Sequence, residues 1–214
     1  DPWVAGAGIQ VNSTSTLQIG DNNNFPGFGV ATANPTNYAT YTISSLSRVS
    51  YVGGLAQSVS NLANPGYGHI LFSGAGAKTS AGSFSVRGNW NNQTTFNHNN
   101  STHTFNGTPT QTIGGTVATI FYNLIENKAS GSLLMGINNN QVNNVLTLTA
   151  GPLDLNSFTL IVNNAALAAV VRTAGYIISE TNSGANPSIL QWNMGATTGA
   201  FVYHFGTSAG VYIP

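Results

Sequence analysis

The stretch THTFNGTPTQTIGGTVATIFYNLIEN, residues 102–127, decides the expected fold. Apolar and polar side chains alternate over short runs, and Asn, Gly, Pro and Thr separate the runs. Such alternation is typical of strands, and the separating residues are typical of turns. The same pattern of aromatic, Gln and aliphatic residues occurs 54 positions earlier in the chain. The matched pairs are Tyr51 and Phe105, Gly53 and Gly107, Gln57 and Gln111, Val59 and Ile113, Tyr67 and Phe121, and Ile70 and Leu124.

The rest of the chain has the same character. Residues 83–89 match residues 143–149 at an offset of 60, so we place six extra residues in the Asn-rich turn 138–140. No segment has convincing helical periodicity, although residues 165–172 suit either a short helix or a strand. Further short strands are expected at residues 38–43, 83–86, 145–148 and 158–162.

A repeat of this length fits two or three turns of a solenoid, in which each coil buries one face against its neighbours. Asn clusters suit the turns between strands, because Asn tolerates left-handed backbone and bonds to nearby backbone groups. We therefore expect an all-β fold, a right-handed parallel β-helix (β-solenoid), with a β-sandwich as the alternative. Alternation along the strands predicts that Val59, Ile70, Ile113 and Leu124 are buried, with Ser58 and Thr112 on the other side.

The expected domain organisation has two parts. Residues 1–163 form a β-solenoid region with an internal repeat, at about 49–100 and 103–163. Residues 164–214 form a C-terminal β-rich continuation. The chain starts with Asp1-Pro2-Trp3 and ends within a strand-like run, so we expect it to be cut from a longer precursor.

Charge is scarce and excludes some classes of function. The 214 residues include only 5 basic and 5 acidic side chains, and charged residues make up 5% of the chain, against about 25% in ordinary soluble domains. No basic patch exists to neutralise phosphates, so nucleic-acid binding is not expected. The longest apolar run, residues 165–171, is far shorter than the roughly 20 residues of a membrane span. The absence of cysteine excludes disulfides and thiolate metal sites.

Several stretches carry a family resemblance: residues 104–115, 121–127, 145–156, 175–178 and 205–214. They resemble motifs of large, adhesin-like surface proteins of Bacteroidetes, which are often exported by the type IX secretion system. The resemblance covers about residues 45–214. It implies a parallel β-helix and a cell-surface location, and it brings no catalytic residues with it.

Carboxylates come first among candidate catalytic groups, because glycoside hydrolysis needs two of them roughly 5–10 Å apart. Glu126 and Asp154 would meet if they lay on adjacent coils. The interpretation we favour is that Glu126 pairs with Lys128 and that Asp154 serves a turn. Nothing groups enough acidic ligands for calcium. The chain's carboxylates are Asp1, Asp21, Glu126, Asp154 and Glu180.

His98 and His103 are the nearest approach to a metal site. Their odd separation places them on opposite faces of a continuous strand, and no third ligand is nearby. His69 and His204 lie in apolar or aromatic contexts and are expected in the core or at its rim. No Gly-x-Ser-x-Gly motif and no dinucleotide-binding motif is present. We therefore predict no catalytic residues, no metal and no cofactor.

Trp3, Trp90 and Trp192 would stack on glycans if they were exposed. For Trp90 we favour burial, and for Trp192 both interpretations stay open. The predicted function is a non-catalytic structural or adhesive segment of a secreted, extracellular cell-surface protein. The alternatives are a subunit of an extracellular filament or sheath, and a glycan-binding or glycan-cleaving β-helix. Candidate partners are glycans, other surface proteins or further copies of the chain.

Overall fold

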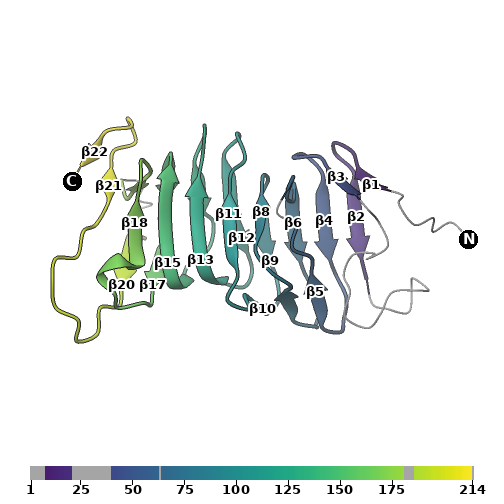
Figure 1. The fold of residues 1–214 in the computed structure, drawn as a ribbon, viewed down its shortest axis with the longest axis horizontal. Coiled ribbons are helices and arrows are strands. Elements are labelled where there is room, and N and C mark those ends of the chain that lie inside the picture. Colours follow the sequence, from purple (N-terminus) through teal and green to yellow (C-terminus); the bar gives the residue numbers. More distant parts are fainter. Residues whose placement is uncertain (1–7, 21–39, 63, 181–185, 214) are drawn as a thin grey trace, which may run out of the picture.

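The computed structural model describes residues 8–20, 40–62, 64–180 and 186–213. In these residues the chain is all-β apart from the short 3-10 helix η2 (Leu167–Ala169). Parallel strands stack coil upon coil along the long axis, which forms a β-solenoid (Figure 1). The expected parallel β-helix is thereby confirmed. The β-sandwich alternative was wrong, because a sandwich is built from antiparallel sheets and the described strands pair in parallel except for the last two.

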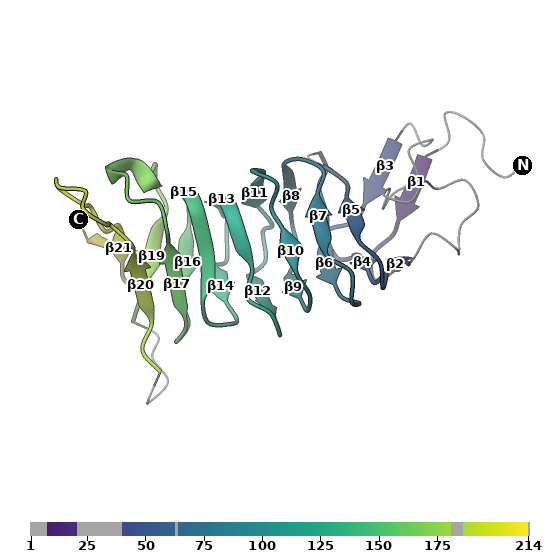
Figure 2. The ribbon, with the colours of Figure 1, turned by 90° about the horizontal axis from the view of Figure 1, so that it is seen from below.

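Each coil has three sides, which recur in the same order along the chain (Figure 2). Side 1 is a ten-stranded sheet of β2 (Thr16–Ile19), β4 (Arg48–Tyr51), β6 (His69–Phe72), β9 (Trp90–Asn92), β12 (Gln111–Gly115), β14 (Leu133–Met135), β16 (Pro152–Asp154), β19 (Tyr176–Ile178), β21 (Phe205–Gly206) and β22 (Tyr212–Ile213).

Side 2 follows side 1 in each coil. It contains β5 (Gln57–Val59), β7 (Lys78–Ser80), β10 (Phe96–Asn97), the first residues of β13 (Ile120–Asn127) and β15 (Asn140–Ala150), β17 (Thr159–Val162) and β20 (Ile189–Trp192). Side 3 contains β8 (Phe84–Val86), β11 (Thr102–Phe105), the later residues of β13 and β15, and β18 (Val170–Arg172). At the N-terminal end, β1 (Gly8–Val11) pairs with β3 (Thr40–Ile43).

The long strands β13 and β15 pass from side 2 to side 3 without a break. Their pairing shifts register between Phe121 and Asn123, and such an irregularity bends a strand. Hydrogen bonds between neighbouring coils join residues 21 apart at this corner, for example Asn123 with Thr102 and Asn144 with Asn123. The coil repeat is therefore close to 21 residues.

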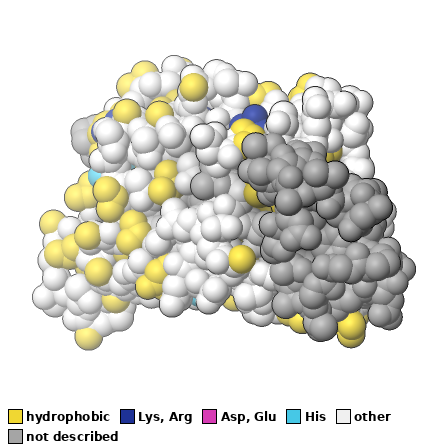
Figure 3. All heavy atoms as spheres, turned by 45° about the vertical axis from the view of Figure 1, so that its right-hand side comes forward, with side chains coloured by type: hydrophobic (Ala, Val, Ile, Leu, Met, Phe, Trp, Pro, Cys, Tyr) yellow, Lys and Arg dark blue, Asp and Glu magenta, His cyan; other side chains and the backbone are white. Residues whose placement is uncertain are grey.

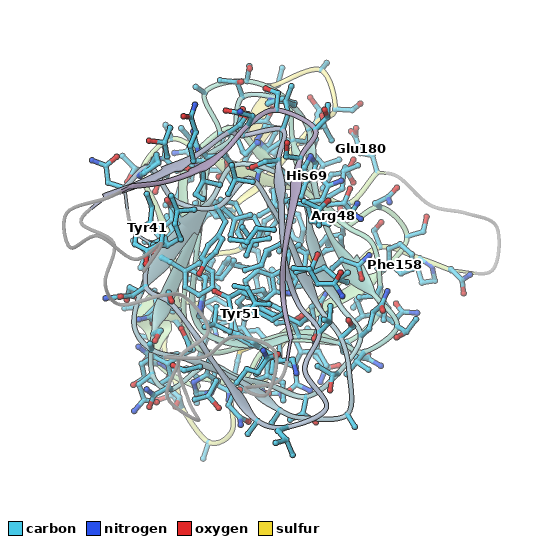
Figure 4. The ribbon with its side chains drawn as sticks, turned by 90° about the vertical axis from the view of Figure 1, so that its right-hand side faces the viewer. Tyr41, Arg48, Tyr51, His69, Phe158 and Glu180 are labelled. Carbon is cyan, nitrogen blue, oxygen red and sulfur yellow. The ribbon has the colours of Figure 1, made fainter. Side chains whose placement is uncertain are left out.

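The interior is filled by inward-facing side chains, and Tyr51 projects into it in the view along the axis (Figure 4). In the first half of the solenoid these are rings in contact, such as Phe72 and Trp90 at 4.9 Å and Trp90 and Phe121 at 5.1 Å between centroids. Farther along, aliphatic side chains replace the rings: Leu124, Leu133, Leu146, Leu148, Leu153, Leu160 and Ile177 are all buried.

The burial predicted from alternation is confirmed. Val59, Ile70, Ile113 and Leu124 are at most 1% exposed, whereas Ser58 and Thr112 are only partly buried on the opposite side of their strands. The matched residues nevertheless lie on different sides of the coil. Tyr51 and Ile70 are on side 1, whereas their partners Phe105 and Leu124 are on side 3. The offset of 54 residues thus spans two coils and two further sides, because one coil is close to 21 residues.

Residues 165–172 contain both elements that the sequence left open. The 3-10 helix η2 comes first, and β18 follows it and pairs with β15. Beyond residue 163 the same sheets continue, since β20 pairs with β17 and β19 pairs with β16. At the C-terminal end β22 turns back antiparallel to β21.

Candidate functional site

Glu126 and Asp154 lie on opposite sides of the solenoid wall. Glu126 is fully buried and belongs to the inward-facing residues of β13. Asp154 is on β16 next to the inward-facing Leu153, so it points outward. Its Oδ1 accepts a hydrogen bond from the Asn156 backbone N–H at 2.8 Å. Asp154 therefore serves a turn, and the two carboxyl groups do not face a common substrate position.

Lys128 sits beside Glu126 at the corner between sides 3 and 1. Its backbone N–H donates to Glu126 Oε1 at 3.0 Å. Its Nζ donates to the Gly107 carbonyl oxygen, to the Pro109 carbonyl oxygen at 2.7 Å and to Gln111 Oε1 at 2.7 Å. The ammonium group thus has three acceptors, which matches its three donors, while Glu126 Oε2 has no hydrogen-bond partner among the described residues.

Gln111 completes the hydrogen bonds that the backbone loses at the same corner. Its Oε1 accepts the Gly107 backbone N–H at 2.8 Å. Its Nε2 donates to the carbonyl oxygens of Val86 at 3.0 Å and Gly88 at 2.5 Å. Buried peptide groups without partners are costly, so this side chain stabilises the turn between two strands.

The corner between sides 1 and 2 contains the same arrangement one repeat earlier. Gln57 Oε1 accepts the Gly53 backbone N–H at 2.8 Å, and its Nε2 donates to Gly20 O at 2.8 Å. Lys78 Nζ donates to the carbonyl oxygens of Gly53 and Gly76, both at 2.7 Å. Gln and Lys are therefore structural groups that close corners in both copies of the repeat.

Burial changes the protonation of the Glu126 and Lys128 pair. Desolvation raises the pKa of Glu126 to about 8, against the smaller opposing effects of the Lys128 and Ala150 backbone hydrogen bonds and the Lys128 charge. Desolvation lowers the pKa of Lys128 to about 8, and the Glu126 charge opposes this. Glu126 is mainly protonated at neutral pH, and both side chains are closed off from solvent.

The two histidines that were considered as metal ligands also lie on opposite sides of the wall. His103 is fully buried among rings, with Phe84 at 4.6 Å and Phe96 at 5.4 Å between centroids. Desolvation, with a smaller contribution from His98, lowers the pKa of His103 to about 3. His98 lies outside, where its Nδ1 accepts the Asn100 N–H. Within the described ranges no three His, Cys, Asp or Glu residues gather to hold a metal ion.

The tryptophans within the described part of the chain are interior residues. Trp90 is 1% exposed and donates from Nε1 to Thr119 Oγ1 at 2.9 Å, which confirms the expected burial. Trp192 is also buried and packs against Phe201, with ring centroids 4.9 Å apart. Trp3, Asp1 and Asp21 lie outside the described residues.

The other two histidines lie at the outer surface. His69 Nδ1 accepts the Asn89 backbone N–H on side 1. His204 Nδ1 is 2.9 Å from the Tyr212 hydroxyl oxygen near the C-terminal end. Both are partly buried, as expected for residues at the rim.

A polar ladder runs along the corner between sides 2 and 3, and the sequence interpretation missed it. Asn123 Nδ2 donates to Thr102 Oγ1 at 3.0 Å, Asn144 Nδ2 to Asn123 Oδ1 at 2.8 Å, and Asn164 Nδ2 to the Asn144 carbonyl oxygen at 3.1 Å. The Thr102 backbone N–H extends the ladder to Ser83 Oγ. One signal was available, because Asn-Asn pairs at 143–144 and 163–164 are one coil apart.

A second set of polar side chains lies beside this ladder, and we call it the corner row: His98, Tyr122, Asn143, Asn163 and Asn193. Tyr122, Asn143, Asn163 and Asn193 each follow a residue of side 2, and these residues pair from coil to coil. The rings of His98 and Tyr122 are 5.5 Å apart. Asn163 donates to Asn143 at 2.9 Å, and Asn193 donates to Asn163 at 2.8 Å.

The surface carries little charge. The face in Figure 3 is mostly uncharged polar and apolar atoms, with few Lys or Arg atoms in view. Within the described ranges no helix is long and apolar enough to span a membrane.

Comparisons with known proteins leave the geometry to stand alone. No protein family matches the chain, and neither a curated protein nor a solved structure matches it. The chain is thus defined by its architecture: a three-sided β-solenoid with Gln and Lys closing its inner corners and amide side chains lining an outer one.

Proposed function

We propose that this chain is a non-catalytic structural and adhesive segment of a secreted bacterial cell-surface protein, a stalk or presenting module. The observation that carries the proposal is the use made of the buried polar side chains. Lys78, Lys128, Gln57 and Gln111 all bond to the backbone where the chain turns between sides. Groups that an enzyme would direct at a substrate are directed here at the fold.

The continuous parallel pairing supports the same function. Side 1 runs through ten strands, and each described coil is bonded to the next along the axis. Such a ladder resists bending, because each coil shares its backbone hydrogen bonds with both neighbours. A stiff, weakly charged rod suits a segment that holds another domain away from a surface. The extracellular location and the relation to Bacteroidetes surface proteins exported by type IX secretion rest on the sequence motifs and belong to this proposal.

Mechanical unfolding of single molecules, pulled by the two ends, tests the stalk function. We expect stepwise unwinding, in which each step releases about one coil of 21 residues, or roughly 70 Å of extended chain. A parallel assay of polysaccharide hydrolysis and elimination tests the absence of catalysis. The proposal fails if the rod yields in one step at negligible force. It also fails if turnover is found that Asp154→Asn or Glu126→Gln abolishes.

A further inference from the structure

We infer that the corner row is a binding strip for an uncharged glycan chain that lies along the solenoid axis. The inference rests on the proposed adhesive function and names the ligand class and its place. The corner row offers one outward-facing side chain from each of several successive coils. Strands in neighbouring coils are about 4.8 Å apart, so its contacts recur at a short, regular spacing that suits a linear chain of pyranose rings.

The first part of the corner row supplies a stacking surface. The rings of His98 and Tyr122 are in contact outside the wall, tilted by 32°, and both are only partly buried. Aromatic faces attract the apolar C–H faces of sugars, while their edges keep polar groups in water. Burial lowers the pKa of His98, which keeps this imidazole neutral.

The second part supplies hydrogen-bonding groups that are already held in place. Asn163 Nδ2 donates to Gln141 Oε1 and Asn143 Oδ1, and Gln191 Nε2 donates to Asn193 Oδ1. An amide carries two N–H donors and two acceptor positions. These bonds therefore leave donors on Asn193 and Gln191 for a ligand hydroxyl. Side chains fixed by their neighbours lose little entropy on binding.

The charge around the corner row selects the ligand. The five segments that supply it contain no Asp, Glu, Lys or Arg, and they are residues 93–101, 118–125, 138–146, 156–166 and 186–196. Acidic polysaccharides and nucleic acids need basic partners. Amides and aromatic rings without charge instead match a neutral, hydroxyl-rich chain.

Isothermal titration with hydroxyethylcellulose, galactomannan, mixed-linkage β-glucan and chitohexaose tests the inference, with alginate as the charged comparison. We expect at least one neutral probe to bind and alginate to bind at least tenfold more weakly. Tyr122→Ala should weaken binding at least tenfold, whereas Tyr122→Phe, which keeps the ring, should bind within about twofold of the unmodified chain. Asn193→Ala should weaken binding severalfold. Asn91→Ala, an exposed change on side 1, should leave it unchanged.

Circular dichroism and the thermal unfolding midpoint of each variant show that a loss of binding is not a loss of folding. The inference is overturned if no neutral probe binds. It is also overturned if alginate binds equally well, or if the folded Tyr122→Ala and Asn193→Ala variants bind like the unmodified chain. Each of these results leaves the stalk function intact, because that function depends on the pulling and turnover measurements alone.

Discussion

Gln57 and Gln111 accept the same hydrogen bond at the same distance, from the backbone N–H of the glycine four residues before each. They do so on different sides of the coil, since Gln57 lies on side 2 and Gln111 on side 1. The chemistry of a corner therefore depends on the local sequence and not on which of the three corners the chain is turning. This explains how a repeat unit that is not a whole number of coils still produces one continuous core.

Removing the Gln111 side chain tests its role at the corner. Gln111→Ala leaves the Gly107 N–H and the carbonyl oxygens of Val86 and Gly88 without this partner. We expect the free energy of unfolding to fall by about 2–5 kcal/mol, because each unsatisfied buried group costs about 1–3 kcal/mol. Urea denaturation measures it. The neighbouring Thr112→Ala should change stability by less than about 0.5 kcal/mol; equal losses for the two variants would contradict the role of Gln111.

Truncation of the inward aliphatic residues tests the core. Ile113→Ala and Leu124→Ala each remove a fully buried side chain. Each should lower the free energy of unfolding by about 2–5 kcal/mol, through lost transfer energy and a residual cavity. Equilibrium unfolding followed by circular dichroism is the measurement, and Asn91→Ala on the outer face serves as the control. Losses below about 1 kcal/mol for both core variants would show that these positions are not packed as described.

The buried Glu126 makes stability depend on pH. Its pKa is raised from 4.5 to about 8 in the folded state, so the folded chain holds a proton that the unfolded chain has released. This stabilising contribution is present below pH 4.5 and is lost as the pH rises through 8. Between pH 6.5 and 8 the histidines no longer contribute, and we expect the urea midpoint to fall. Glu126→Gln should flatten this decline; an unchanged slope in that variant would assign the decline to another group.

His103 acts in the opposite direction at lower pH. Its pKa is lowered from 6.5 to about 3, because the ring is buried among aromatic side chains. The unfolded chain therefore binds the proton more readily, and stability rises with pH from about 3 to 6.5. Below pH 4.5 the shift of Glu126 contributes little. In that range we expect the thermal midpoint to rise with pH, and the rise should be much smaller in His103→Phe, which keeps an aromatic ring in place.

The outer ladder should be cooperative between coils. Asn123→Ala and Asn144→Ala each break the bond that joins these side chains, at a cost of about 0.5–1.5 kcal/mol. In the double variant the losses should add to less than their sum, because the first change already removes the shared bond. A double-mutant cycle from urea denaturation gives the coupling energy. Strict additivity would mean that the ladder is not a coupled structure.

Alternation was enough to predict the strands and the core. Phe158 to Val162 and Ser83 to Val86 alternate clearly, and their inward residues are buried whichever sheet they join. The coil length was not recognised. The strongest internal match lies at 54 residues, whereas coils repeat at close to 21. Within one coil the inward residues change from rings to aliphatic side chains, so the apolar character persists while residue identity does not.

The candidate sites depended on which side of the wall a residue faces. Sequence spacing brought Glu126 and Asp154 to neighbouring coils, but one points inward and the other outward. The roles of Lys128 and Gln111 could not be read from spacing, because their acceptors are backbone carbonyl groups of the preceding coil or turn. The amide ladder could have been found, since stacking places residues one coil apart in contact.

The three-sided coil also governs how such a chain can change its length. An insertion of one whole coil adds a layer and leaves every outer row aligned. An insertion of a single side, roughly a third of the 21-residue coil, keeps inward residues inward, yet it rotates everything that follows by one side. The core tolerates both insertions, whereas a row such as Asn143, Asn163 and Asn193 continues only through the first kind. Variation in length by whole coils would therefore mark a lineage that preserves its surface, and variation by single sides one that preserves only its interior.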